Sequence, residues 1–449
     1  MRRMPLKPVA LAVAVVALSG CAIIDRLNAG QAEKEALEKE GRIAMVIGDE
    51  RLQPDPSLAT VPVTLPDART LSQWTEAGSR PAKAIGHVRA ADTLERAWRV
   101  RVGKGSTQRS ALMTPPVASA QTIYTIDSRQ RLAAFDLETG ARQWTKTLES
   151  GSRRDRIGIG SGIALTEDGT RLIVASGFGF VTVLDASNGA EIWRTDTIAP
   201  MTGSPTVKDG RLFVSSNNNE VIAFDLDTGD ILWSDQAIAE SARVLSSPSP
   251  AAVEDIVVVP YSSGEVIAYL ASNGRRLWSE ALSAPGQFTP ISSINDISAR
   301  PVLGGGLVFA ASQSGILAAI DGRTGNRVWQ QPIGSTQAPA LAGEFLFVIG
   351  TEGELACLNA GTGQVMWVRD LPQYRNAKNK KGRITYAGPI IASNRVLIAS
   401  SRGDLLALNV QTGEEMDRLK LGDPVYIEPI VVQDKLFILT DDARLIAIR

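Results

Sequence analysis

A short motif that recurs seven times constrains the fold of this 449-residue chain more than any other feature. Each copy has an anchor residue, usually Asp or Asn, followed by a Gly four residues later in all seven copies and a Trp eight residues later in six. The anchors are Asp136, Asp185, Asp225, Leu270, Asp321, Asn359 and Asn409, and the last copy has Asp417 in the Trp position. The chain contains only 40 Gly and 8 Trp, so this shared register indicates a structural repeat.

The residue types within the motif predict a β-hairpin. An Asp or Asn side chain can accept hydrogen bonds from backbone N–H groups two or three residues on, and Gly supplies a positive φ. The segments before each anchor are rich in β-branched residues, and a further short strand opens upstream, in most units with a Pro. Each unit therefore contains four strands, and a Trp in the outermost strand would pack between neighbouring sheets. The predicted blade-packing residues are Trp98, Trp144, Trp193, Trp233, Trp278, Trp329 and Trp367.

The two ends of the repeat region complement one another. The last unit begins its second strand at Lys435 and stops at Arg449, before any turn or Trp. The missing outer strand stands at the other end, at Ala97 to Val100 with Trp98. We therefore predict an all-β fold, an eight-bladed β-propeller of four-stranded antiparallel blades over 97–449, closed by the N-terminal strand in the last blade. The length is about 44 residues per blade, as such blades need, and a linear β-solenoid would not explain the split unit.

The first twenty residues predict export and lipidation. Arg2, Arg3 and Lys7 precede an apolar run of ten residues, which is too short for the roughly 20 residues that span a bilayer. The sequence Leu18-Ser-Gly-Cys21 resembles the lipobox of bacterial lipoproteins, which implies cleavage before Cys21, lipidation of Cys21 and, with Ala22 next, export to the outer membrane. An ordinary signal peptide followed by an incidental Cys is the alternative.

These features divide the chain into three parts. Residues 1–20 are the predicted lipoprotein signal peptide, 21–96 a lipid-anchored flexible tether, and 97–449 the propeller. Five Pro between positions 54 and 81 favour an extended tether. Within it, Trp74 to Gly78 resembles a Trp-x-x-x-Gly motif found ahead of related propellers.

Composition excludes several function classes. A formal net charge of −1 gives no reason to expect a nucleic acid partner. The single His, His87, and the two Cys cannot build a Cys/His zinc site, a haem-attachment motif with its axial His, or a Ser-His-Asp triad in the folded body. If Cys21 carries lipid, Cys357 has no disulfide partner, and its apolar neighbours indicate a small buried hydrophobe. No metal and no cofactor is expected.

The repeat resembles the blades of quinoprotein (PQQ-dehydrogenase-type) propellers, and the repeat together with the lipobox resembles the BamB family. Members of that family are lipoproteins of the outer-membrane β-barrel assembly (Bam) machine that bind its central component, BamA. The resemblance implies a non-enzymatic scaffold on the periplasmic face of the outer membrane, monomeric within the complex, that supports the folding and insertion of outer-membrane proteins. Unfolded outer-membrane proteins are a further candidate partner.

Two segments resemble the family segments that contact BamA. Arg243 and Asp296 match a contacting Arg and Asp, whereas Ser298 stands where the family has a second Asp. Arg243 lies five residues before Pro248 and Asp296 five before Pro301, so both are expected at one rim of adjacent blades. The predicted partner-binding residues are thus Arg243, Asp296 and Ser298, and the alternative is that they are solvated loop charges.

A third loop, residues 375–383, carries five cations: Arg375, Lys378, Lys380, Lys381 and Arg383. They could meet acidic lipid or a partner, or be solvated.

Three other functions remain open: a ligand sensor, an envelope scaffold with another partner, and a quinoprotein dehydrogenase. In the resemblance, such a dehydrogenase needs a calcium site of Glu, Asn and Asp around the quinone, a catalytic Asp and in many cases adjacent Cys residues. This chain has no adjacent Cys and shows no inserted acidic cluster near a blade centre.

Overall fold

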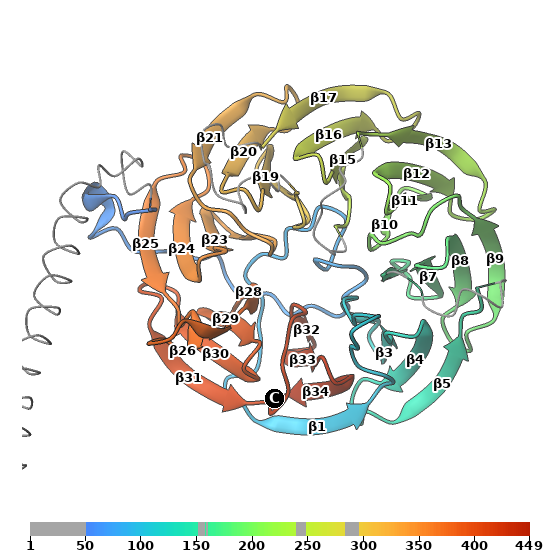
Figure 1. The fold of residues 1–449 in the computed structure, drawn as a ribbon, viewed down its shortest axis with the longest axis horizontal. Helices are drawn as coiled ribbons and strands as arrows, with labels where there is room; N and C mark the ends of the chain where they lie inside the picture. Colours follow the sequence, from blue (N-terminus) through green and yellow to red (C-terminus); the bar gives the residue numbers. More distant parts are fainter. Residues whose placement is uncertain (1–50, 151–157, 159, 239–247, 283–295) are drawn as a thin grey trace, which may run out of the picture. The chain divides into compact units, whose positions relative to one another are not determined.

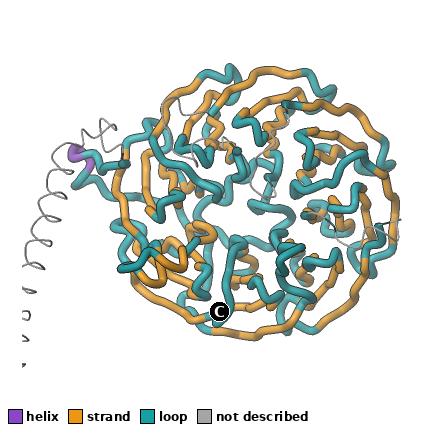
Figure 2. The backbone as a smooth tube through the Cα atoms, viewed as in Figure 1, coloured by secondary structure: helices purple, strands orange, loops and turns teal. Residues whose placement is uncertain are grey.

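A computed structural model describes residues 51–150, 158, 160–238, 248–282 and 296–449. Residues Leu52–Arg449 form one compact unit. Eight four-stranded antiparallel sheets stand around a central axis, and in seven of them the strands follow the sequence order from the inner to the outer strand (Figures 1 and 2). The predicted eight-bladed propeller is confirmed. Among the described residues no helix has the length and apolar character needed to cross a membrane.

The strands are distributed over the blades as follows. Blade 1 holds β2 (Val117–Ala118), β3 (Thr122–Ile126), β4 (Arg131–Asp136) and β5 (Arg142–Thr147), and blade 2 holds β6 (Ser161–Leu165), β7 (Arg171–Ser176), β8 (Phe180–Asp185) and β9 (Glu191–Asp196). Blade 3 holds β10 (Thr206–Lys208), β11 (Arg211–Ser215), β12 (Glu220–Asp225) and β13 (Ile231–Gln236), and blade 4 holds β14 (Ala251–Val253), β15 (Ile256–Pro260), β16 (Glu265–Leu270) and β17 (Arg276–Ala281). Blade 5 holds β18 (Val302–Gly304), β19 (Leu307–Ala311), β20 (Leu317–Asp321) and β21 (Arg327–Gln331), and blade 6 holds β22 (Ala340–Ala342), β23 (Phe345–Ile349), β24 (Glu354–Asn359) and β25 (Val365–Asp370). Blade 7 holds β28 (Tyr386–Ala392), β29 (Arg395–Ser400), β30 (Asp404–Asn409) and β31 (Glu415–Lys420). Blade 8 holds β32 (Ile430–Val432), β33 (Lys435–Leu439), β34 (Arg444–Ile448) and β1 (Arg96–Arg101). Outside the blades lie the 3-10 turn η1 (Pro56–Leu58) and a hairpin of β26 (Tyr374–Asn376) and β27 (Lys381–Arg383).

The eighth blade is split between the two ends of the propeller, as predicted. Strand β1 pairs antiparallel with β34, and Trp98 lies opposite Ala447. The Trp98 ring packs beside Phe437 of β33, with ring centroids 5.7 Å apart. The first strand of the ring therefore supplies the outer edge of the last blade.

The recurring turn joins each blade to the one before it. In the first copy, the Asp136 carboxylate accepts hydrogen bonds from the backbone N–H groups of Glu138 and Thr139, and Gly140 has a φ of +71°. A Cβ atom at Gly140 would lie 2.9 Å from the ring of Trp98 in the neighbouring blade. All seven turn glycines have a positive φ and meet the preceding blade's Trp in this way. The glycine is therefore needed both for its conformation and for its missing side chain.

Six tryptophans also bind the next blade through their indole nitrogens. Trp144 Nε1 donates to the carbonyl oxygen of Ala186 at 3.0 Å, directly after the anchor of blade 2. The indole nitrogens of Trp193, Trp233, Trp278, Trp329 and Trp367 donate to the equivalent carbonyl of the next blade. These six tryptophans thus contact the neighbouring sheet.

This contact explains why the seventh blade carries Asp417 where the others carry Trp. A blade's Trp packs on the recurring turn of the next blade, and blade 8 has no such turn, because its outer edge comes from β1. Instead, Glu95 and Arg449 join their backbones there by two hydrogen bonds of 2.8 and 3.2 Å. A Trp at position 417 would have no turn glycine to cover.

The described part of the predicted flexible tether is ordered and packed, which corrects that prediction for residues 52–96. Residues 66–90, here called the strap, cross the ring and are drawn in blue within it in Figure 1. Trp74 is fully buried and shares two backbone hydrogen bonds with Ala118 of blade 1. The physical reason is that these residues complete the hydrogen bonding of the inner strands, which a free linker would leave unpaired.

The strap contacts every blade. Its backbone carbonyls accept hydrogen bonds from the N–H groups of Leu165, Ala252, Leu303, Ser393 and Gln433, which belong to blades 2, 4, 5, 7 and 8. The Glu76 carboxylate accepts from the Val207 N–H in blade 3, and Pro66 packs against Gly343 in blade 6. The strap thus ties together blades that do not touch one another.

A buried ion pair fixes the strap internally. Glu76 and Lys83 pair through Oε2 and Nζ, with side-chain exposures of 2% and 0%. Burial raises the pKa of Glu76, and the Lys83 ammonium opposes that shift. An unpaired charge at this depth would be costly, so each residue depends on the other.

Candidate partner-binding face

The two faces of the propeller carry different loops. Because strands alternate in direction within a blade, the turn between its second and third strands and the connection to the next blade lie on the same face. We call this the connection face, and the opposite side, with the other two turns of each blade, the turn face. The strap contacts residues at the ends of the inner strands and therefore lies on the turn face.

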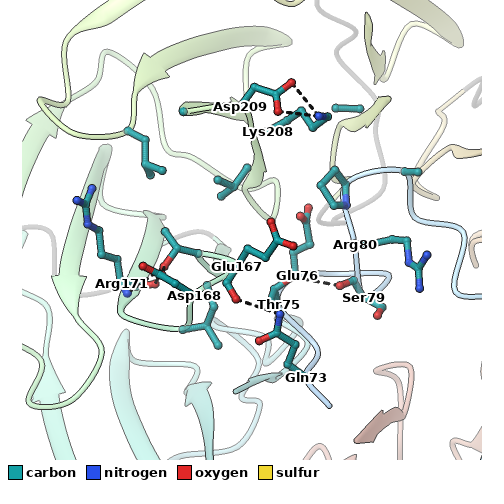
Figure 3. A pocket seen from close by; sticks show the side chains of 18 of the residues that line it. Gln73, Thr75, Glu76, Ser79, Arg80, Glu167, Asp168, Arg171, Lys208 and Asp209 are labelled. Carbon is teal, nitrogen blue, oxygen red and sulfur yellow. Dashed lines mark hydrogen bonds and ion pairs between the residues drawn. The ribbon is translucent and has the colours of Figure 1, made fainter. Parts of the chain in front are cut away.

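A groove of about 1270 Å³ remains on the turn face between the strap and blades 2 to 4 (Figure 3). Two ion pairs lie in its lining: Lys208 with Asp209 at 2.7 Å and Arg171 with Asp227 at 2.6 Å. Gln73 of the strap donates to the Glu167 carbonyl across the groove at 3.0 Å. These four charges are paired within the protein, and Arg80, Glu167 and Glu254 also line the groove.

The connection face holds the two described members of the predicted partner site. Asp296 is 3% exposed and lines a small cavity of about 90 Å³ with Asn219, Tyr261 and Ser262. Ser298 is 6% exposed and lines a second cavity, of about 290 Å³, nearer the axis. Arg243 lies outside the described residues. The structure therefore shows two inward-lying residues where the sequence suggested surface loop positions.

The strand register corrects the spacing argument that paired Arg243 with Asp296. Ala251 pairs with Val258 in the way that Val302 pairs with Phe309, so Pro250, not Pro248, is equivalent to Pro301. Counting five residues back from Pro250 reaches Leu245, and Arg243 lies two residues further from the strand. Arg243 and Asp296 thus do not lie at the same sequence distance from the inner strands that follow them.

Two exposed isoleucines stand out on the rim of this face. Ile198 is 96% exposed and Ile238 is 72% exposed. Each follows the Trp of its outer strand by five residues, so they occupy equivalent positions in the adjacent blades 2 and 3. Sequence reasoning missed them because a single Ile in a loop has no periodic signal. Single exposed apolar side chains are common on protein surfaces, so these two are singled out because they recur at the same position of adjacent blades.

The cavity that Ser298 lines contains several other polar side chains. Arg300 Nη2 pairs with Glu428 Oε2 at 2.5 Å, and burial raises the pKa of Glu428 while the guanidinium opposes the shift. Tyr386 and Gln337 line the same cavity. In the part of the chain that the structure describes, no three His, Cys, Asp or Glu side chains gather into a metal-binding group.

Cys357 is fully buried in β24, and burial raises the pKa of its thiol. Its predicted character as a small buried hydrophobe is confirmed.

A family model described as outer membrane protein assembly factor BamB matches residues 154–369 and 351–449. The chain belongs to the BamB family. A curated BamB from Moranella endobia (strain PCIT) is 23% identical over 337 residues, which cover 74% of this chain and 84% of that protein. The crystal structure of BamB from Moraxella catarrhalis matches with a TM-score of 0.68 at 18% identity, covering 80% of this chain and all of that one.

The BamB fold is shared with enzymes. A family model for the β-propeller domain of glucose, ethanol and alcohol dehydrogenases matches residues 80–194. The quinohemoprotein alcohol dehydrogenase from Comamonas testosteroni matches with a TM-score of 0.66 at 14% identity, covering 89% of this chain and 82% of that one. At this identity the likeness concerns the fold alone.

Proposed function

We propose that this protein is a non-enzymatic scaffold of the outer-membrane β-barrel assembly complex, which binds BamA and supports the insertion of outer-membrane proteins. The observation that carries the proposal is the match to the BamB family model across 154–449. A rigid ring held at a membrane would act by raising the local concentration of its partners, not by chemistry.

Several features support placing BamA on the connection face. The strap covers much of the turn face, whereas Ile198 and Ile238 leave apolar surface exposed on the connection face. Asp296 and Ser298 lie on the same face, on the inner side of the connections. Arg243 belongs to the preceding connection in the sequence. We therefore propose that the two isoleucines and Arg243 contact BamA directly, and that Asp296 and Ser298 shape the loop that does so.

Replacing Ile198 and Ile238 together by Ser should reduce the amount of BamA that co-purifies with the protein by about tenfold or more, as expected for apolar anchors in an interface. The melting temperature should stay close to that of the wild type, because both side chains are exposed. Arg243→Ala should weaken BamA binding independently.

The matched control is Val328→Ser with Met416→Ser. These side chains are 51% and 58% exposed and lie on the outer strands of other blades. The control should retain BamA. Full BamA recovery with the Ile198/Ile238 variant would place the interface elsewhere.

We further propose that the protein is attached to the outer membrane through lipid on Cys21, because its N-terminus resembles a lipoprotein signal. Cys21→Ala should yield a protein that is not acylated and no longer floats with membranes, since an acyl chain contributes about 0.8 kcal/mol per buried CH₂. Intact-mass measurement of the wild type decides the matter: an unmodified mature N-terminus would contradict the anchor.

The likeness to quinoprotein dehydrogenases favours one second candidate, an enzyme that binds a quinone. Titration of the purified protein with pyrroloquinoline quinone, followed by absorbance, separates the two functions. The scaffold proposal expects no saturable change.

A further inference from the structure

The hairpin of β26 and β27 is an addition to the ring. It lies in the connection between blades 6 and 7 and pairs Tyr374 with Arg383 and Asn376 with Lys381. Its position in an inter-blade connection places it on the connection face. It also contains all five cations of the 375–383 loop.

Two of these cations tie the hairpin to the ring. Arg375 Nη2 donates to the carbonyl oxygen of Ser401 in blade 7 at 2.9 Å. Arg383 Nη2 donates to the Thr351 carbonyl in blade 6 at 2.5 Å and lies 3.4 Å from the Glu352 carboxylate. The base of the hairpin is therefore held by both neighbouring blades, which fixes the direction in which its tip projects.

The other three cations are presented to solvent at the tip. Lys378, Lys380 and Lys381 are exposed, and no described carboxylate lies within ion-pair distance of them. Asn379 lies between the lysines, and Ala377 precedes them. Three positive charges within four residues are thus held together at a fixed place.

The residue types at the tip favour an anionic membrane over a protein partner. Protein interfaces are depleted in Lys and enriched in aromatic residues and Arg, and the tip from Asn376 to Gly382 contains no aromatic and no large apolar side chain. Lysines near an anionic bilayer are attracted without any shaped pocket. The tip has the composition suited to such a diffuse surface.

The N-terminal segment lies in the same sector of the ring as the hairpin, but on the turn face, because it contacts the start of β25 and the turn between β30 and β31. Asp55 N–H donates to the Val365 carbonyl of blade 6, and Val63 exchanges two hydrogen bonds with the Gln411 side chain of blade 7. Figure 1 shows η1 beside β25 and β26 beside β30, in the same sector of the ring. The first described residues of the chain therefore contact the two blades that hold the hairpin.

We propose that the tip lysines of the β26–β27 hairpin bind the acidic phospholipid headgroups of a membrane surface and turn blades 6 and 7 toward it. The hairpin opposes the overall charge of the protein, since removal of residues 1–20 leaves 44 basic and 48 acidic residues. The contact is electrostatic and local, and it is separate from the Ile198 and Ile238 rim in blades 2 and 3. It goes beyond the scaffold function and does not depend on BamA.

The test is co-sedimentation of the Cys21→Ala protein with vesicles, so that no acyl chain contributes. Vesicles of phosphatidylcholine alone are compared with vesicles that also contain phosphatidylglycerol. The protein should bind only the anionic vesicles, and binding should be lost at high salt, where charges are screened within a few ångströms, about 3 Å at 1 M. Lys378→Gln with Lys380→Gln and Lys381→Gln should lower the partition coefficient roughly a hundredfold.

The matched control removes the same charge from the turn face, by Arg142→Gln, Arg275→Gln and Arg323→Gln, all exposed residues at or next to the recurring turns. This control should bind like the parent, and both variants should melt like it. Equal binding by the lysine variant, an equal loss in the control, or displacement by inorganic phosphate at constant ionic strength would each overturn the proposal. Displacement by phosphate would indicate a site for free phosphate. BamA binding is measured separately, so failure of the membrane proposal leaves the scaffold function unaffected.

Discussion

Replacing β1, Arg96–Arg101, by a Gly-Ser segment of equal length is expected to open the ring and lower the melting temperature sharply. The replacement keeps the span between the strap and blade 1 but removes the partner of β34. It also removes the Trp98 ring from Phe437 and Gly140, and truncating a packed Trp costs about 3–5 kcal/mol by itself. The exposed edge of β34, whose residues Leu445 to Ile448 are buried in the intact ring, should then promote self-association.

The control replaces six residues of the N-terminal segment, Glu33 to Glu38, by the same linker. Thermal unfolding and size-exclusion chromatography should show a low-melting, associating protein only for the β1 variant. If both variants melt at the same temperature, the eighth blade does not depend on β1 in solution.

The buried pair in the strap provides the second large effect. Lys83→Met should lower the free energy of unfolding by about 3–5 kcal/mol at neutral pH, because Glu76 would be left charged and buried. The double variant Lys83→Met with Glu76→Leu should recover much of this loss, since replacing a whole buried pair by apolar residues is often close to neutral. Denaturant unfolding of the two single variants and the double variant measures the coupling.

The Lys83→Met variant should also acquire a pH dependence. Burial already raises the pKa of Glu76 above its usual value of 4.5, and removal of the opposing ammonium raises it further. A carboxyl whose pKa is higher in the folded state stabilises the fold at low pH and loses that contribution as the pH rises. The deficit relative to wild type should therefore be smaller at pH 5 than at pH 8, and the double variant should lack this difference. A pH-independent deficit would mean that Glu76 is not buried as a charge.

The repeat made most of the fold predictable. Asp136, Gly140 and Trp144 have roles in a turn and a contact that recur from blade to blade, so their spacing is a readable pattern in most copies. The split blade was predictable for the same reason, since Trp98 stands without a preceding turn and the last repeat unit reaches Arg449 without a Trp. The exception at Asp417 is also explained by the pattern: each Trp packs on the recurring turn of the next blade, and the blade after Asp417 lacks that turn.

The strap was not predictable as a packed element, because its contacts follow no period. It binds through single backbone hydrogen bonds to separate blades, and its prolines are equally compatible with a free linker. One signal was present: Trp74 is the only Trp outside the blades. In the structure Trp74 is fully buried, and Gly78 has a φ of +78° with no room for a Cβ beside Arg300. The Trp-x-x-x-Gly spacing thus has a structural cause.

The candidate site was harder to derive than the fold. In Ser247-Pro-Ser-Pro250 either proline could open the inner strand, and only the pairing of Ala251 with Val258 settles the register. The burial of Asp296 was equally unpredictable, because the residues next to it in a loop sequence do not indicate whether a charged side chain is buried. The equivalence of Ile198 and Ile238 is recognised only when the strands of blades 2 and 3 are aligned with each other.

The position of β1 sets the order in which the molecule can be completed. A chain is synthesised from its N-terminus, so β1 is made before any blade, while its partner β34 lies among the last residues, Arg444–Ile448. Blades 1 to 7 each contain four consecutive strands and need no distant segment to form their sheets. Strand β1 therefore stays without its partner until β34 has been synthesised. Loss of β34 would therefore leave β1 without its partner, so the first strand of the ring and its last blade are lost together.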